Sequence, residues 1–272
     1  MQIGEDQRLR SHYMRHLLQG STPAGPPSTA LVIPRVIVQF WHDGTDIPAD
    51  VRNCMETWAP LLLLGFRRRL FDDNEARRFI ARHLGRVSVA AFDRCVHPAM
   101  RSDYFRLCYL YKNGGFYVDA DDEYRGGDCE SLLSDPSLKL QPLCYDRLTD
   151  AMVDPAIFLS STAYSPHWTF YVNNNPLVSP ARHPVVRLAL ARSTRLLLDQ
   201  ELSRFDIQST TGPGNLTASL VTHAIDADLH GKARDFEIWT NWETIAVSHW
   251  PLSYRKDDRN WRLWRAKVAL HA

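Results

Sequence analysis

The sequence predicts an α/β fold, a three-layer α/β/α sandwich around a mixed, mainly parallel central sheet. Strand-like and helix-like segments alternate through the first half of the chain, which is typical of parallel strands joined by helices. The run "ALVIPRVIVQFWH" is rich in Val and Ile and indicates a buried strand. Several short strand candidates follow in the second half, and these make the predicted sheet mixed.

The individual elements follow from local patterns and capping residues. A helix over 72–85 has Asp72 or Asp73 near its start and Gly85 past its end. The next helix begins at Pro98, a favoured first-turn residue, and ends at Asn113–Gly114–Gly115. The other strand candidates are 35–41, 65–72, 116–119, 137–146, 154–161, 167–174, 235–239 and 244–249, and the other helices lie within 46–60, 183–205 and 212–229.

Composition is that of a soluble globular protein, with 44% hydrophobic and 23% charged residues. The net charge of +1 over 272 residues gives no global field that would favour nucleic acid as a partner. The cysteines are odd in number and irregularly spaced, so we expect reduced thiols, no zinc site and a cytoplasmic protein. They stand at positions 54, 95, 108, 129 and 144.

The two ends of the chain are predicted to flank one folded domain. Residues 1–30 form a basic segment with a Pro/Gly linker at 20–29, and they contain no apolar core of signal-peptide length. No run reaches the ~18 apolar residues that a membrane span needs. The main domain covers 31–253, and 254–272 is a basic helix with Trp261 and Trp264 on one face. That helix packs on the domain or, as an alternative, contacts the inner membrane surface peripherally.

A burst of acidic residues follows the strand candidate at 116–119, in "FYVDADDE". Side chains alternate along an extended chain, so Asp119 and Asp121 can point the same way. Two carboxylates at a strand end suit Mg²⁺ or Mn²⁺, which removes their repulsion and leaves positions for phosphate oxygens. The alternative is a solvated acidic turn. The preceding Gly114–Gly115 pair is expected to let the backbone approach a ligand closely.

The helix before this strand carries a second polar feature. Asp103 and Arg106 are three residues apart and share one helix face. Apolar residues cover most of the remaining circumference, so the pair is expected to be partly buried and to face the same cavity as the acids. The alternative is an ordinary ion pair within the helix. Arg101 lies on a different face and is expected to be a surface or structural arginine.

The stretch "RSDYFRLCYLYKNGGFYVDAD" resembles the signature of the DXD-containing sugar transferases, glycosyltransferase family 32. This family includes fungal outer-chain mannosyltransferases and bacterial polysaccharide enzymes, and glucosylating clostridial toxins share its core pattern. "IPRVIVQFWHDGTDIP" is similar to the opening strand of the family, and "YVNNNPLVSPARHP" and "TGPGNLT" are similar to later segments. The chain departs from the family at Val38, where His is common, and at Tyr254, where the closing segment has Trp.

The resemblance implies a GT-A fold, a UDP- or GDP-sugar donor, a divalent cation (Mn²⁺ or Mg²⁺) and retention of anomeric configuration. Asp103 and Arg106 would hold the donor sugar, and Asp119 would touch ribose and sugar hydroxyls as the third catalytic residue. Gln39, Trp41 and Asn174 would also bind the donor, with Trp41 beside the base, although Asn173 and Asn175 compete with Asn174 for the register. Asp121 and His249 would be the metal ligands.

These features predict a metal-dependent hexosyltransferase that acts in polysaccharide biosynthesis on a glycan, a lipid-linked or a small-molecule acceptor. Three other interpretations of the function stay open. One is a catalytically silent sugar-nucleotide-binding protein, and another is a toxin-like enzyme that modifies a host protein. The third is a phosphatase of the haloacid dehalogenase type, although Glu123 stands where that class has Thr.

Overall fold

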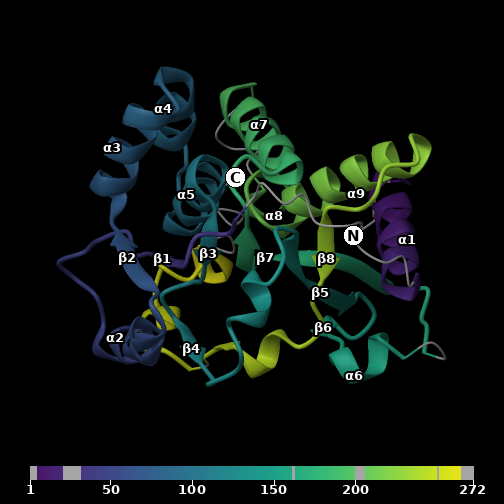
Figure 1. The fold of residues 1–272 in the computed structure, drawn as a ribbon, viewed down its shortest axis with the longest axis horizontal. Helices are drawn as coiled ribbons and strands as arrows, with labels where there is room; N and C mark the ends of the chain where they lie inside the picture. Colours follow the sequence, from purple (N-terminus) through teal and green to yellow (C-terminus); the bar gives the residue numbers. More distant parts are fainter. Residues whose placement is uncertain (1–4, 21–31, 161–162, 200–205, 250, 265–272) are drawn as a thin grey trace.

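A seven-stranded sheet runs through the middle of the computed structural model (Figure 1). The structure describes residues 5–20, 32–160, 163–199, 206–249 and 251–264, so most of the predicted 20–29 linker and the end of the predicted C-terminal helix lie outside the described residues. The strands of the sheet are β1 (Val36–Phe40), β2 (Arg67–Phe71), β3 (Gly115–Tyr117), β5 (Leu138–Asp146), β6 (Ala151–Met152), β7 (Trp168–Ser179) and β8 (Phe236–Ile238).

The strand order is β2-β1-β3-β7-β5-β6, with β8 paired to β5 as well. β1 runs parallel to β2 and β3, β7 runs antiparallel to β3 and β5, and β8 runs parallel to β5. Because β6 is antiparallel to β5, five of the seven strands point the same way. The predicted mixed, mainly parallel sheet is therefore confirmed. A separate two-stranded sheet pairs β4 (Asp122–Tyr124) with β9 (Ala246–Ser248).

Most of the helices pack on one side of the sheet. In Figure 1, α3, α4, α5, α7 and α9 lie above the sheet, and Phe158 of α6 joins the same hydrophobic cluster as residues of these helices. The α-helices are α1 (Glu5–Gln19), α2 (Ala49–Glu56), α3 (Asp73–His83), α4 (Arg86–Asp93), α5 (Pro98–Asn113), α6 (Pro155–Phe158), α7 (Pro184–Asp199), α8 (Ile207–Thr210) and α9 (Pro213–Leu229). The 3₁₀ turns are η1 (Ala59–Leu64), η2 (Ser131–Leu133), η4 (Trp242–Thr244) and η5 (Ser253–Lys256).

The core has two halves because the central strands bury both faces. Along β1, Val36 and Val38 join the larger hydrophobic cluster, whereas Ile37 joins the cluster on the opposite face. Along β3, Tyr117 and Phe116 divide in the same way. Successive side chains of a strand point to opposite faces, so this division confirms a layer of packing on each side of the sheet.

The predicted strand at 154–161 is wrong, because residues 155–158 form the short helix α6. The Asp154 side chain accepts a hydrogen bond from the Ala156 backbone N–H at 2.7 Å, and Pro155 occupies the first turn. These are the start signals of a helix, and they outweigh the strand-like apolar run that follows them. Helix α4 was not predicted either.

Both ends of the described chain pack on the domain. Helix α1 contributes Met14 and Leu17 to the larger cluster, and Ser11 Oγ accepts the Phe170 N–H at 2.9 Å. At the other end, Trp261 and Trp264 pack against the same cluster. Within the described residues, none of the helices has the length and apolar character to span a bilayer.

The two glycines before the acidic run are needed for packing within the protein. Gly114 has φ +68°, and a Cβ there would lie 2.7 Å from the Ala181 N and 2.8 Å from the Ser179 O. At Gly115, with φ +118°, a Cβ would lie 3.0 Å from the Val36 O. The close approach that the sequence predicted is thus an approach to neighbouring segments of the chain, and it lets helix α5 turn directly into β3.

Candidate active site

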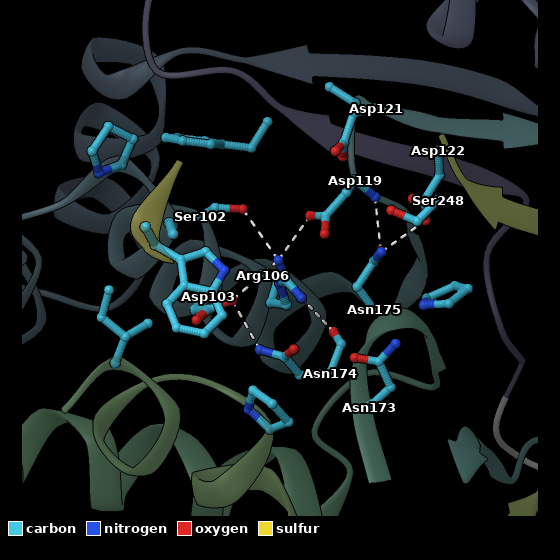
Figure 2. Close-up of a pocket in the computed structure, with 18 of the residues that line it drawn as sticks. Ser102, Asp103, Arg106, Asp119, Asp121, Asp122, Asn173, Asn174, Asn175 and Ser248 are labelled. Carbon is cyan, nitrogen blue, oxygen red and sulfur yellow. Dashed lines mark hydrogen bonds and ion pairs between the residues drawn. The ribbon is translucent and has the colours of Figure 1, made fainter. Parts of the chain in front are cut away.

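A cavity of about 770 Å³ opens where β1 and β3 end. This volume lies within the range of small-molecule sites. The edge at which adjacent parallel strands end is also where α/β folds commonly bind ligands. Figure 2 shows the polar side chains that converge there from β7, from α5 and from the segment after β3. Among the lining residues are Trp41, Asp103, Arg106, Asp119, Asp121 and Asn174.

Arg106 organises one half of this cavity. Its guanidinium donates to Asp119 Oδ1 at 2.8 Å, to the Asn174 backbone O at 2.6 Å and to Ser102 Oγ at 3.2 Å. It also lies 3.2 Å from Asp103 Oδ1 and stands over the Tyr117 ring at 4.4 Å. The side chain is only 3% exposed, so these contacts replace water around the charge and hold it in one orientation.

Asp119 is the more accessible carboxylate of this half. Its side chain is 31% exposed, compared with 10% for Asp103. Desolvation, partly offset by the Arg106 charge and reinforced by the Asp121 charge, raises the pKa of Asp119 to about 6. Its backbone N–H donates to Asn175 Oδ1 at 2.8 Å, so a side chain from β7 sets the position of this residue.

Asp103 is held from several sides within the helix packing. Asn174 Nδ2 donates to its Oδ1 at 2.8 Å, and Thr211 Oγ1 donates to its Oδ2 at 3.3 Å. Burial raises the pKa of Asp103, while the Arg106 charge and these hydrogen bonds oppose that rise. The structure therefore brings Asp103, Arg106, Asp119 and Asn174 together, as the sequence predicted.

Asp121 also faces the cavity, but a different arginine holds it. Its Oδ2 accepts from Arg255 Nη2 at 2.5 Å and from the Tyr254 hydroxyl at 2.6 Å. Desolvation and the Asp121 charge raise the pKa of Tyr254, so its hydroxyl stays protonated and donates. Both partners come from η5, close to the C-terminal end of the described chain.

The carboxylates around Asp121 have the chemistry of a hard-cation site. Asp122 is buried, and its Oδ1 has no hydrogen-bond partner among the described residues. Burial, followed by the charges of Asp121 and Asp119, raises the pKa of Asp122 well above its usual value. A cation would relieve this repulsion. Within the described ranges, no three or more His, Cys, Asp or Glu side chains are grouped so that they could hold a metal ion.

His249 is not brought into this group. Its side chain is 49% exposed and its Nδ1 lies 3.5 Å from Glu123 Oε2. Its backbone N–H donates to the Asp121 O at 3.3 Å. Its role as a metal ligand stays a prediction.

Gln39 and Trp41 lie at the end of β1, next to the acidic run. Gln39 is fully buried, its Nε2 lies 3.4 Å from the Asp119 O, and its Oε1 has no partner among the described residues. Trp41 lines the cavity, donates from Nε1 to the Asp46 O at 3.0 Å and meets the Tyr254 ring edge-on at 5.2 Å. Trp41 is therefore both a core aromatic and a cavity wall.

Sequence reasoning missed several residues that shape this cavity. Asn175 links two parts of the acidic run, because its Oδ1 accepts from the Asp119 N–H and its Nδ2 donates to Asp122 Oδ2 at 2.7 Å. Arg255 was assigned only to a basic tail, and Tyr254 was noted only as standing where the closing segment of the family has Trp. The run of three asparagines was a signal for Asn175. The pairing of Arg255 with Asp121 had no local signal.

Comparisons with known proteins agree with this geometry. Residues 41–127 match the family described as "Glycosyltransferase sugar-binding region containing DXD motif". An uncharacterized glycosyltransferase of Acanthamoeba polyphaga mimivirus is 27% identical over 95 residues, which cover 33% of this chain and 36% of that protein. The match thus spans about a third of that relative's length.

A solved structure shows the same overall fold. The PaToxG glycosyltransferase matches with a TM-score of 0.50 at 13% identity, over 96% of this chain and 95% of that one. Together these findings confirm the resemblance to the DXD-containing glycosyltransferases over residues 41–127 and the GT-A-type α/β fold. They favour this class over the phosphatase alternative.

Proposed function

We propose that the chain transfers a hexose from a UDP- or GDP-linked donor, because residues 41–127 match the sugar-binding region of the DXD-containing glycosyltransferases. The acceptor is a hydroxyl of a glycan, a glycolipid or a small molecule. One observation carries the proposal: Asp103, Arg106, Asp119 and Asp121, with Asn174 from a distant strand, line one cavity. Three further arginines line it as well, which suits an anionic diphosphate.

The donor sugar and ribose bind against the half of the cavity that Arg106 organises. Asp119 is the most exposed carboxylate there and accepts hydrogen bonds from donor hydroxyls. Asp103 and Asn174 complete the sugar contacts. Arg106, already surrounded by protein partners, acts chiefly by holding Asp119 and Asp103 in place.

The base and the diphosphate bind at the other end of the donor. Trp41 offers an aromatic surface to the base, and base stacking of this kind contributes about 1–3 kcal/mol in nucleic-acid systems. Gln39 supports the backbone of Asp119 beside it. Asp121, with Asp122 adjacent, would hold Mn²⁺ or Mg²⁺, which stabilises negative charge on the departing diphosphate when bound.

Transfer proceeds with retention, by attack of the acceptor on the face that the diphosphate leaves. The carboxylates nearest the proposed sugar position, Asp103 and Asp119, are both neutralised by Arg106. A carboxylate held in this way is a poor covalent nucleophile, so we favour direct attack, with the departing phosphate accepting the acceptor's proton. Isolation of a glycosyl–enzyme adduct would contradict this step.

The test is a screen of UDP- and GDP-hexoses for Mn²⁺-dependent release of the nucleoside diphosphate. Asp121→Asn should lower the release rate of the preferred donor by at least about 100-fold, because charge on the leaving group loses its stabilisation. Thermal unfolding should show that this variant remains folded. The matched control is Glu123→Gln, which removes one charge from the same acidic run at a side chain that pairs with Arg125.

Two outcomes would contradict the proposal. If Asp121→Asn turns over the donor like the wild-type protein, the assignment of the metal to Asp121 is wrong. If the wild-type protein binds UDP or GDP yet hydrolyses and transfers none of the sugars tested, the silent sugar-nucleotide-binding protein is the better description.

A further inference from the structure

Asp121 already has a cationic partner in this structure. Arg255 Nη2 and the Tyr254 hydroxyl both bond to the same oxygen, Oδ2, at 2.5 and 2.6 Å. The two side chains of the ion pair are only 11% and 15% exposed. A metal ion that takes this oxygen must therefore displace the guanidinium or stand beside it, and two cations at one carboxylate repel each other.

The backbone of the arginine is anchored, whereas its side chain is long. Ser253 N–H and Oγ donate to the Asp50 carboxylate at 2.6 and 3.0 Å, and Leu252 is buried beside Trp41. On the other side, Asn260 Nδ2 donates to the Arg255 backbone O at 2.8 Å. With the backbone held on both sides, the guanidinium can change partner by side-chain rotation without displacement of the segment.

The guanidinium also donates to a neutral partner, Ser248 Oγ at 3.2 Å, and a bound diphosphate would offer it anionic partners. Arg255, Arg259 and Arg262 all line the cavity to which the proposed function assigns the diphosphate. A diphosphate presents several acceptor oxygens to an arginine fork, and such charge-assisted bonds are strong. The donor thus brings both a replacement anion for Arg255 and, with its cation, a replacement charge for Asp121.

We propose that Arg255 is an exchangeable cation of the donor site, which neutralises Asp121 in the empty site and moves to the diphosphate when the donor and its divalent cation bind. The inference rests on the proposed function and deepens it. It means that Arg255 competes with the metal but assists the nucleotide. The metal therefore binds weakly alone and more tightly with nucleotide, and the coupling between the two is reciprocal.

The test measures the two affinities separately, without turnover. Mn²⁺ is titrated into nucleotide-free protein and followed by the electron paramagnetic resonance signal of the free ion. UDP, and GDP in a parallel arm, is titrated at saturating Mn²⁺ by calorimetry. In Arg255→Gln, Mn²⁺ should bind about tenfold more tightly and the preferred nucleotide about tenfold more weakly.

Two further variants separate exchange from general charge effects. Arg255→Lys keeps the charge, so the weak Mn²⁺ binding of the wild-type protein should persist. Arg125→Gln removes a nearby charge that pairs with Glu123 at 3.1 Å and does not line the cavity, and its Mn²⁺ affinity should stay within about twofold of wild type. Thermal unfolding checks that each variant is folded.

The exchange is supported only if Arg255→Gln binds Mn²⁺ more tightly and the nucleotide more weakly than the wild-type protein. A merely structural role for Arg255 would weaken both ligands in Arg255→Gln, and a pure diphosphate contact would leave the Mn²⁺ affinity unchanged. Either result overturns the exchange. If the wild-type protein binds neither Mn²⁺ nor nucleotide, the donor site itself is wrong, and this inference falls with it.

Discussion

Two aspartates of one short motif pair with two very different arginines. Asp119 meets Arg106, which projects from the middle of the 16-residue helix α5, whereas Asp121 meets Arg255, which projects from a four-residue turn. Arg106 is 3% exposed and has protein partners on several sides. Arg255 is 15% exposed and lines the cavity.

The difference separates two halves of the site. We call the part around Asp119 and Arg106 the fixed half, and the part around Asp121 and Arg255 the adaptable half. A charge within packed helix and strand keeps its geometry without a ligand, and such preorganisation favours binding of a defined sugar ring. A charge on a short turn can change partner at little cost. The contrast therefore predicts that substitutions of Arg106 damage both stability and turnover, whereas substitutions of Arg255 mainly redistribute ligand affinities.

The largest effect is expected at Arg106. Arg106→Lys keeps the charge but loses the planar fork that reaches Asp119, Asp103 and the Asn174 backbone O together. We expect kcat/KM for the donor to fall by about 10²–10³. Arg106→Ala should in addition cost about 3–5 kcal/mol in the free energy of unfolding, because the buried Asp103 and the half-buried Asp119 lose their partner.

Arg101 on the same helix provides the control. It pairs with Asp73 at 2.9 Å outside the cavity and is 23% exposed. Arg101→Lys should change kcat/KM by less than about twofold and the unfolding free energy by less than about 1 kcal/mol. Steady-state kinetics and urea unfolding measure both quantities. If Arg106→Lys behaves like Arg101→Lys, the fork is not needed and the fixed half has no special role.

The fixed half is also the part of the site that the sequence predicts best. Asp103 and Arg106 are three apart on a helix, a spacing that alone makes them neighbours, and they lie 3.2 Å apart. The capping signal at Asp72 and the proline at 98 likewise mark the starts of α3 and α5. Local spacing is sufficient where the contacts are local.

The adaptable half depends on contacts between distant positions. Arg255 and Asp121 are 134 residues apart, and Asn175 and Asp122 are 53 apart, so no periodicity connects them. Alternation along β7 also fails to say which of Asn173, Asn174 and Asn175 faces the site, since all three line the cavity. The family resemblance favoured Asn174. That Asn175 also bonds to both Asp119 and Asp122 could be seen only in the tertiary structure.

An intermediate effect is expected from the ionisation of Asp119. Its pKa is raised to about 6, first by desolvation, so below that pH the free enzyme carries a protonated Asp119 that cannot pair fully with Arg106. If the ionised form binds the donor, kcat/KM should fall about tenfold per pH unit below about pH 6 and level off above it.

The contribution of Asp119 to the free energy of unfolding should change with pH in the opposite direction to kcat/KM. A carboxyl whose pKa is raised on folding binds its proton more tightly in the folded state, so its contribution to stability decreases as pH rises from about 4 to about 6. Asp119→Asn, compared by urea unfolding at these two pH values, should lose this part of the pH dependence. A flat kcat/KM profile between pH 5 and 7 would show that Asp119 need not be ionised.

The smallest effect is expected at Trp41, which joins the two halves of the cavity. Trp41→Phe keeps an aromatic face toward the cavity and the Tyr254 ring but loses the Nε1–H bond to the Asp46 O. One such bond contributes about 0.5–1.5 kcal/mol, so the Kd of the preferred nucleotide should rise only about threefold in calorimetric titrations. A tenfold or larger rise in the Kd would instead mean that the position of the loop at Asp46, rather than the aromatic surface of Trp41, controls binding of the base.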